Sequence, residues 1–338
     1  MLYIHQYPDW TNFRYNHQSV ADALGQTRFL EGKLVGTADL VSSSEEETSI
    51  LAQDIAANFS LDGYVLDAEQ IKQEIAKRNG AVDAVRNILG ALQNANSPLT
   101  EDRLFAWHAA IGQNKVRKFR SKESSIRFQD GDKNRTFVGV SPDRIPHEME
   151  RFLNWFETAS VDGAIKAAIA QFWFLTIRPF DDGNGRIART LSAMLLARSE
   201  ETARCQYPLN KLFAEHRDEY RRILSQAQAG NGDLTEWILF FLKNLRDSIE
   251  RRLTELAPAL KNMQVRLKFS QMDFTPRERR LLEAALSGAL SVPFSVKEAA
   301  ALTDVSHDSS LRDIQSLIEK GVFKAEKKGG RSQRYSLF

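Results

Sequence analysis

Apolar residues recur along most of the chain with the three- and four-residue spacing of amphipathic helices. In the first segment, about residues 1–90, this spacing predicts several helices. One of them starts at Thr48, after a stretch rich in serine and glutamate, and ends near Asp62-Gly63, because glycine commonly follows the last residue of a helix. We therefore expect the N-terminal region to be helical.

The second segment, about residues 91–257, has longer apolar runs. Its most apolar run, Ala164 to Ile177, is interrupted by Lys166 and Gln171 and is shorter than the ~18 apolar residues of a membrane span. We expect a helix buried in a globular core there, and no contact with a membrane. The run 136–140 is rich in β-branched and aromatic residues and is the best candidate for a short strand.

The third segment, about residues 271–338, differs in pattern from the rest. Helical spacing predicts three helices, over about 276–286, 296–302 and 306–320. Two short strands are predicted after them, joined by a turn at Lys327-Lys328-Gly329-Gly330. Three helices followed by a hairpin is the order of a winged helix-turn-helix.

Composition narrows the class of protein. A chain of 338 residues is longer than the roughly 250–300 residues that usually share one core, so we expect several domains. The 46 basic and 44 acidic side chains leave a net charge of +2, so any binding of nucleic acid must rest on a local patch. Cys205 is the only cysteine, which excludes an intramolecular disulfide and is typical of the cytoplasm. The polar start predicts no signal peptide.

Residues 178–189, Arg-Pro-Phe-Asp-Asp-Gly-Asn-Gly-Arg-Ile-Ala-Arg, carry the strongest chemical signal. An apolar helix should end before Pro179 and a new one should begin at about Arg186. Gly183 and Gly185 allow the backbone to approach a ligand closely. The amide groups of residues 183–186 should then converge at a helix N-terminus, which is a natural site for phosphate.

Charged residues around this loop strengthen the phosphate interpretation. Arg186 and Arg189 are three residues apart, on one face of the predicted helix, where both can contact a polyphosphate. Asp182 stands just before the glycines, and a carboxylate beside phosphates suits Mg²⁺. A plain helix cap with two surface arginines is the alternative. The joint occurrence of these residues with an aromatic anchor, Phe180, favours the phosphate site.

The same stretch resembles the signature of the Fic (Fido) family, HPFx(D/E)GNGRxxR, at every fixed position but the first. Ile4-His5-Gln6 and Pro8-Asp9-Trp10 resemble the start of an N-terminal helical region often joined to such domains. The resemblance implies a mainly α fold, the Fic (Fido) helical fold with a small β-hairpin flap. It also implies three parts: a helical region at 1–90, a Fic core at 91–257 and a C-terminal winged helix-turn-helix at 271–338.

The resemblance implies transfer of AMP from ATP to a Ser, Thr or Tyr hydroxyl of a target protein. In this sequence Asp182 would hold Mg²⁺. The α- and β-phosphates would be held by Gly183, Asn184 and Gly185, with help from Arg186. Arg189 would bind the γ-phosphate.

The resemblance also places the flap near the predicted strand. A segment of the target protein could add there as a further strand. The flap residues would be Thr136, Phe137, Val138, Gly139 and Val140.

The first departure from the family signature is Arg178, which stands where the family has a histidine that acts as general base. A guanidinium stays protonated at physiological pH and cannot accept the proton of an incoming hydroxyl. Loss of a positioned base typically costs about 10²–10⁴-fold in rate. Activity of this form is therefore expected to be impaired, although the added cation could preserve nucleotide binding.

The second departure lies at residues 58–63, which resemble a degenerate form of the family's inhibitory helix, (S/T)xxxE(G/N). Here Asn58 replaces the Ser or Thr, and Asp62 replaces the glutamate that pairs with the second arginine. Aspartate is one methylene shorter, so a bridge to Arg189 requires closer helices. An Asp-Gly helix stop without inhibitory function is an equally good interpretation.

The C-terminal segment leaves two functions open. From residue 320 to 334 we count six Lys or Arg against one Glu, which could contact DNA phosphates. Candidate DNA contacts are His307, Arg312, Lys327, Lys328, Arg331 and Arg334. Acidic residues on the third helix favour a protein partner instead, and a homodimer is a further option. The alternative to an enzyme is thus a non-catalytic nucleotide-binding regulator that acts through its winged helix on DNA or a protein.

Overall fold

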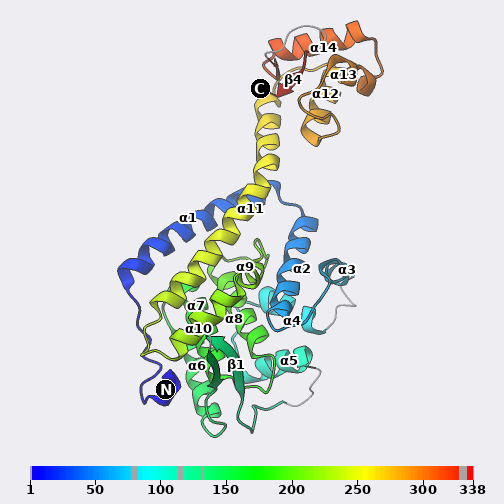
Figure 1. Ribbon diagram of the computed structural model, residues 1–338. Coiled ribbons are helices and arrows are strands. Elements are labelled where there is room, and N and C mark those ends of the chain that lie inside the picture. The colour runs from blue at the N-terminus through cyan, green and yellow to red at the C-terminus, as the bar shows by residue number, and fades with distance from the viewer. Residues whose placement is uncertain (1, 78–82, 113–116, 131–132, 327–332, 338) are drawn as a thin grey trace. The chain divides into compact units, whose positions relative to one another are not determined.

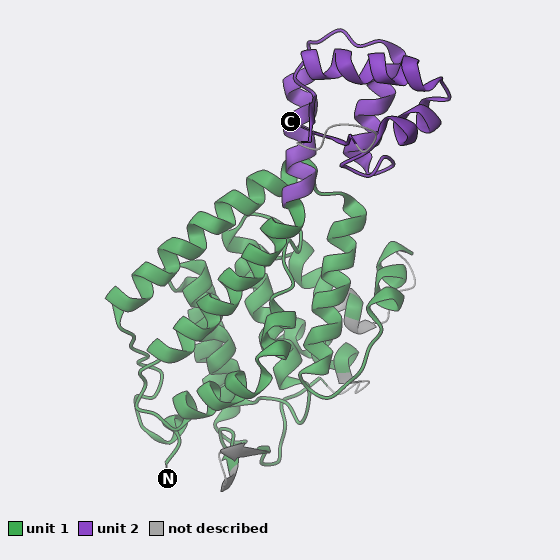
Figure 2. Ribbon diagram, turned by 45° about the horizontal axis from the view of Figure 1, so that its top comes forward, with its two compact units in different colours: residues 1–256 green, residues 257–338 purple. Residues whose placement is uncertain are grey.

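The computed structural model describes residues 2–77, 83–112, 117–130, 133–326 and 333–337, and these are mainly helical, as predicted (Figure 1). The chain forms two compact units, residues 1–256 and 257–338 (Figure 2). The boundary lies within the long helix α11 (Thr235–Phe269). The predicted N-terminal region and the predicted Fic core therefore lie in the same unit.

The first unit contains most of the helices. Its elements before the hairpin are η1 (Ile4–Gln6), α1 (His17–Val41), α2 (Ser44–Ser60), α3 (Ala68–Ala76), α4 (Asp83–Gln93) and α5 (Glu101–Gly112). Those after the hairpin are α6 (Ile145–Thr158), α7 (Gly163–Ile177), α8 (Asn184–Ser199), α9 (Leu209–Glu215), α10 (Arg217–Gln228) and most of α11. Among the described helices, none is long and apolar enough to cross a membrane.

Helix α7 is the centre of the core. Every residue from Ala164 to Ile177 is buried, as the apolar run predicted. Lys166, which interrupts that run, donates through Nζ to the carbonyl of Ala159 at 2.8 Å, so its charge ends at the edge of the core. Trp237 of α11 is fully buried and donates through Nε1 to the carbonyl of Ala168 at 2.7 Å. The core thus holds the end of α7, from which the loop at 178–183 leaves.

Helix α2 begins at Ser44, four residues before the predicted start at Thr48. The reason is a capping box, in which the hydroxyl of Ser43 accepts from the amide of Glu46 and the Glu46 carboxylate accepts from the amide of Ser43. The stretch rich in serine and glutamate before Thr48 therefore supplies the first turn of the helix. The predicted stop near Gly63 is confirmed, with Gly63 at φ +91°.

A two-stranded antiparallel hairpin, β1 (Ser125–Asp130) with β2 (Lys133–Val138), is the only sheet described in the first unit. Its register runs from Ser125 opposite Val138 to Asp130 opposite Lys133. The predicted strand at 136–140 is wrong at its end, because the strand stops at Val138. Gly139 leaves it and donates its amide to the carbonyl of Ser124 at 2.9 Å.

The second unit has the predicted order of elements. Three helices, α12 (Pro276–Ser287), α13 (Val296–Thr303) and α14 (His307–Glu319), precede the antiparallel strands β3 (Phe323–Ala325) and β4 (Tyr335–Leu337). Phe294 bridges to Tyr335 and adds a short third pairing. The predicted turn at Lys327-Gly330 lies outside the described residues.

Candidate active site

The loop between α7 and α8 is shaped by two residues in the left-handed backbone region. Arg178 ends α7 with φ +53°, which is uncommon for a residue with a side chain, and its amide donates to the carbonyl of Phe174 at 2.9 Å. Gly183, with φ +77°, is the N-cap of α8. The helix starts at Asn184, two residues before the predicted start at Arg186. The loop is therefore tighter than expected.

The side chain of Asn184 closes this loop. Its Oδ1 accepts from the amide of Phe180 at 3.0 Å, and its Nδ2 donates to the carbonyl of Phe180 at 2.7 Å. Phe180 is fully buried, as predicted, and stacks on His108 with ring centroids 4.1 Å apart. Burial lowers the pKa of His108. The Asn184 side chain thus holds the loop together, which leaves its backbone amide as the donor expected to serve a phosphate.

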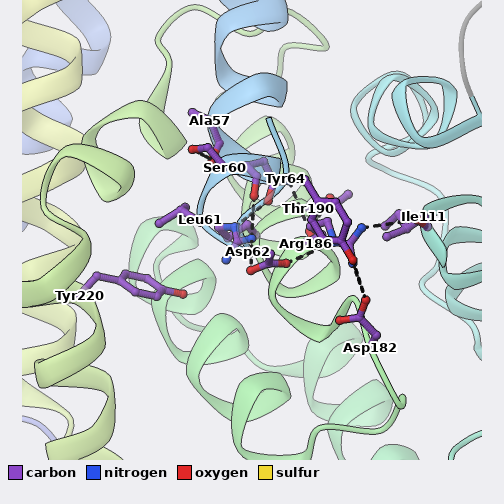
Figure 3. A network of polar contacts seen from close by, with 12 residues as sticks. Ala57, Ser60, Leu61, Asp62, Tyr64, Ile111, Asp182, Arg186, Thr190 and Tyr220 are labelled. Atoms are coloured by element: carbon purple, nitrogen blue, oxygen red, sulfur yellow. Dashed lines mark hydrogen bonds and ion pairs between the residues drawn. The ribbon is translucent and has the colours of Figure 1, made fainter. Parts of the chain in front are cut away.

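Asp62 joins the N-terminal region to both arginines of α8. Figure 3 shows its contact with Arg186. Its Oδ1 accepts from Nη2 of Arg189 at 3.0 Å, and its Oδ2 accepts from Nε of Arg186 at 3.2 Å. A Cβ built on Gly185 would lie 2.7 Å from Asp62 Oδ1, so the carboxylate sits directly over the first turn of α8. The shorter aspartate does reach Arg189, because glycine at 185 lets the chains approach.

Asn58 and Tyr220 complete the surroundings of Arg189. Arg189 donates through Nε to Asn58 Oδ1 at 2.6 Å and through Nη2 to the Asn58 carbonyl at 2.8 Å. Burial opposes its charge, but the Asp62 carboxylate and the Tyr220 hydroxyl raise the pKa of Arg189 above its ordinary value. Arg189 is thus a fully buried cation held from α2 and α10.

Asp182 and Tyr64 surround Arg186 on its other side. Arg186 donates through Nη2 to Asp182 Oδ2 at 3.0 Å, and the Tyr64 hydroxyl donates to the same oxygen at 3.2 Å. The guanidinium also lies over the Tyr64 ring, 4.5 Å from its centroid, and donates to the carbonyl of Ile111 at 3.4 Å. Asp62, Asp182 and Arg186 therefore form one network (Figure 3).

Arg178 points into the same region but lacks a carboxylate partner among the described residues. Its side chain is 8% exposed, and Nε donates to Ser124 Oγ at 3.3 Å. Burial lowers the pKa of Arg178 to about 10, and the neighbouring Arg120 cation acts in the same direction. Arg178 therefore remains protonated at neutral pH and cannot act as a general base there.

Arg120 fixes the turn that carries Arg178. Its Nε donates to the carbonyl of Arg178 at 2.7 Å, and its amide donates to the carbonyl of Pro179 at 2.9 Å. It also donates to the carbonyl of Val140, just after the hairpin. One buried cation thus ties the end of α7 to the base of the hairpin.

These elements enclose a pocket of about 320 Å³, within the usual range for small-ligand sites. The end of α2, the hairpin, the loop 178–185 and α10 line it. Lining side chains include Asp62, Arg127, Phe137, Arg178, Arg189 and Arg221. The chain's six histidines are all described, and none lines this pocket. His147, for example, is exposed on α6.

The backbone at the start of α8 opens to this pocket. Gly183, Asn184 and Gly185 line it, and within the described residues no oxygen accepts from the amides of residues 184–186. Asp62 covers this turn but bonds to the arginines. The donors required for a phosphate are therefore present.

The residues fit Mg²⁺ only in the presence of a ligand. The described residues hold no group of three or more His, Cys, Asp or Glu side chains that could bind a metal by themselves. Asp182 lines the pocket with its side chain 69% exposed. Mg²⁺ is commonly bound by one or two carboxylates plus substrate phosphates, so a single accessible carboxylate suits that mode.

The other predicted residues divide between the two units. Of the predicted flap, Phe137 lines the pocket, whereas Thr136, Val138, Gly139 and Val140 do not. In the second unit His307 and Arg312 are exposed, and Arg334 donates to the carbonyl of Pro293 at 2.8 Å. Lys327, Lys328 and Arg331 lie outside the described residues.

Sequence reasoning missed several residues of the site. These are Tyr64, Arg120, Arg127, Tyr220 and Arg221. Tyr64 could have been suspected, because it follows Asp62 by two residues. The other four come from segments about 30 residues or more from the signature, roughly the length of a supersecondary unit, and nothing in their local pattern marks them.

Two known domain models match separate parts of this chain. A model of the Fic/DOC family matches residues 98–196, and a model of a domain of unknown function (DUF4172) matches residues 3–80. Protein adenylyltransferase fic-1 of Caenorhabditis elegans is 29% identical over 150 residues, which are 44% of this chain and 27% of that protein. Its counterpart in Caenorhabditis briggsae is 31% identical over 118 residues, 34% of this chain and 22% of that protein. The chain thus matches about a quarter of the length of these relatives.

Solved structures show the same fold. A Fic family protein from Desulfovibrio desulfuricans G20 superposes with a TM-score of 0.56 over 95% of this chain and 96% of that chain, at 19% identity. A fragment of Fic-1 from C. elegans gives a TM-score of 0.50 over 70% of this chain and 73% of that chain, also at 19% identity. With the signature loop, the buried arginines and the pocket in place, residues 98–196 are identified as a Fic/DOC family domain.

Proposed function

We propose that the chain is a nucleotide-binding scaffold of the protein adenylyltransferase type, which binds ATP and Mg²⁺ at the start of α8. The observation that carries the proposal is the first turn of α8, where Gly183, Asn184 and Gly185 line one pocket together with the buried Arg189. Gly183, Asn184 and Gly185 would bind the α- and β-phosphates through their amides. Arg186 would assist them, and Arg189 would bind the γ-phosphate.

Asp182 would hold the cation. Its side chain lines the pocket and is 69% exposed. Tyr64 and Arg186 both donate to its Oδ2. Bound there, Mg²⁺ would neutralise charge on the phosphates. Loss of these contacts would remove one of the two carboxylates that hold Arg186.

The reaction proposed is attack of a target Ser, Thr or Tyr hydroxyl on the α-phosphorus of ATP. The new bond joins that oxygen to phosphorus, the bond to the β-phosphate oxygen breaks, and pyrophosphate leaves. The hydroxyl proton requires an acceptor. Arg178 stands where a base is needed and remains protonated, so we propose that this form binds nucleotide but transfers AMP slowly or not at all.

The position of Asp62 indicates that nucleotide binding is also inhibited from within the chain. Its carboxylate occupies the space over Gly185 and engages both arginines that would bind phosphates. A triphosphate would have to displace it, because two anions cannot share the same arginines at low cost. We propose that Asp62, aided by Asn58, is inhibitory.

A non-catalytic regulator is the second candidate function. The buried, uncompensated Arg178 in the pocket favours it, because a cation there attracts a nucleotide while removing the base. In this case the C-terminal unit would transmit the bound state to DNA or a protein partner. That role, the homodimer and the cytoplasmic location expected from Cys205 stay predictions.

The test compares the chain with Arg178→His and with the double variant Arg178→His/Arg189→Ala. Each is incubated with Mg²⁺ and ATP labelled on the α-phosphate, alone and with a cell lysate. We expect protein labelling by Arg178→His, little by the chain itself, and none by the double variant. If Arg178→His binds ATP but labels nothing, even when Asp62→Ala also removes the inhibitory carboxylate, the transferase proposal fails and the regulator is favoured.

A further inference from the structure

The first residues of the chain contact the hairpin from outside the nucleotide pocket. The Tyr3 hydroxyl donates to the backbone carbonyl of Thr136 in β2 at 2.7 Å. The Tyr3 ring packs edge-on against Phe137 with centroids 4.9 Å apart, and the His5 ring does so at 5.7 Å. One strand of the hairpin is thus held by a hydrogen bond and two aromatic contacts from a segment more than 130 residues away.

This segment is itself anchored in the core. Ile4 is 1% exposed and Trp10 is 2% exposed. Trp10 donates through Nε1 to Oε1 of Glu148 on α6 at 3.2 Å, and its ring packs edge-on against Trp173 of α7. Arg144, the N-cap of α6, donates to the carbonyl of His5 at 3.0 Å. The contacts on the hairpin therefore come from a rigid support.

The hairpin requires such a support. A two-stranded hairpin is at best marginally stable in water unless it packs against something else. Phe137 is 3% exposed, because Tyr3 and His5 cover it on one side while it also lines the nucleotide pocket. The position of this one ring thus connects the N-terminal segment with the wall of the pocket.

We infer that Tyr3, with His5, is a positioning residue that sets the place of β2 and Phe137 at the site. This inference rests on the proposed function only in taking the hairpin as the flap on which a target segment would dock. The domain of unknown function that matches this chain begins at residue 3. The inference gives the first residues of that domain a role in positioning the hairpin. The N-terminal segment thus packs against the hairpin, whereas Asp62, just after α2, contacts Arg186 and Arg189.

The test measures backbone amide hydrogen exchange in β2, without nucleotide or target. Three variants are compared with the chain. Tyr3→Phe removes the hydroxyl and keeps the ring, Tyr3→Leu removes both, and Tyr7→Phe is the matched control, a lost hydroxyl on an exposed tyrosine in the same segment. One hydrogen bond contributes about 0.5–1.5 kcal/mol, so we expect exchange of β2 amides about 2–10-fold faster in Tyr3→Phe and faster still in Tyr3→Leu.

Exchange in α7 should stay unchanged in all variants, which separates a local effect on the flap from a general loss of stability. Unchanged β2 exchange in both Tyr3 variants, or an equal rise in Tyr7→Phe or in α7, would overturn the inference. In the Arg178→His background, Tyr3→Phe should raise the KM for a protein target more than it lowers kcat. If Arg178→His proves inactive, the proposed function fails, and the exchange data still decide the role of Tyr3.

Discussion

Asp62 and Arg189 are 127 residues apart in sequence, yet Asp62 Oδ1 accepts a hydrogen bond from Arg189 Nη2 at 3.0 Å. Arg189 is buried, whereas the Asp62 side chain is 23% exposed at the edge of the pocket. The buried cation thus lies directly behind this carboxylate, in the wall of the pocket. A phosphate that enters the pocket competes with Asp62 for the same guanidinium.

Replacement of Asp62 should therefore increase nucleotide affinity. Hydrogen bonds to charged groups contribute about 1.5–3 kcal/mol, so we expect Asp62→Ala to bind ATP about ten-fold more tightly or better in calorimetric titrations with Mg²⁺. Asp62→Asn, which keeps the shape and removes the charge, should give part of the gain.

Glu69→Gln is the control for Asp62, because it removes an exposed carboxylate from α3, away from the arginines. It should leave ATP affinity unchanged. An affinity of Asp62→Ala equal to or lower than that of the unaltered chain would show that the carboxylate does not compete with phosphate.

Gly139 marks a close approach between the base of the hairpin and the end of α7. A Cβ at this position would lie 3.1 Å from the Arg178 Cβ, from the Ile177 carbonyl oxygen and from an Arg120 guanidinium nitrogen. Since two of these atoms are held by the backbone, Gly139→Ala should destabilise the fold by about 1–3 kcal/mol. Urea unfolding at constant m-value measures this. Gly36→Ala, at an exposed glycine with open space around it, is the control and should not destabilise.

Glu200 should make stability depend on pH. Burial raises the pKa of Glu200 from 4.5 to about 8. The hydrogen bond from Tyr207 lowers this pKa, whereas the nearby charge of Glu31 raises it further. Between about pH 4.5 and 8 the folded state keeps a proton that the unfolded state releases, so this group makes stability fall as pH rises through that window. Each unit of pKa shift corresponds to about 1.4 kcal/mol at most.

Urea unfolding at pH 5, 6, 7 and 8 checks the effect of Glu200. Glu200→Gln cannot release a proton, so its free energy of unfolding should fall less over this range than that of the unaltered chain. Part of the slope should persist, because burial also raises the pKa of Glu31 and raises that of Asp54 to about 6. Identical slopes in the two proteins would contradict the assignment.

The signature loop could be predicted from the sequence because its geometry depends on local rules. Pro179 ends one helix, Gly183 accepts a left-handed backbone, and the amides after it must converge where the next helix begins. The start of α8 was misplaced by two residues because the side chain of Asn184 bonds back to Phe180, a contact that spacing alone does not indicate.

Contacts between distant segments could not be predicted in the same way. Whether Asp62 only stops a helix or also binds Arg189 depends on the distance between α2 and α8, which the residues near Asp62 do not determine. The support of β2 by Tyr3 likewise depends on tertiary packing. In both cases the residue types were visible in the sequence, but their partners were not.

The central claim, that the first turn of α8 binds a polyphosphate, is tested most directly by the backbone amide signals of residues 183–186 in an NMR titration of Asp62→Ala with ATP and Mg²⁺. We predict that these signals shift more than those of any other segment and saturate together. Saturable binding that leaves these amides unmoved, or no shift at millimolar ATP, would contradict the account.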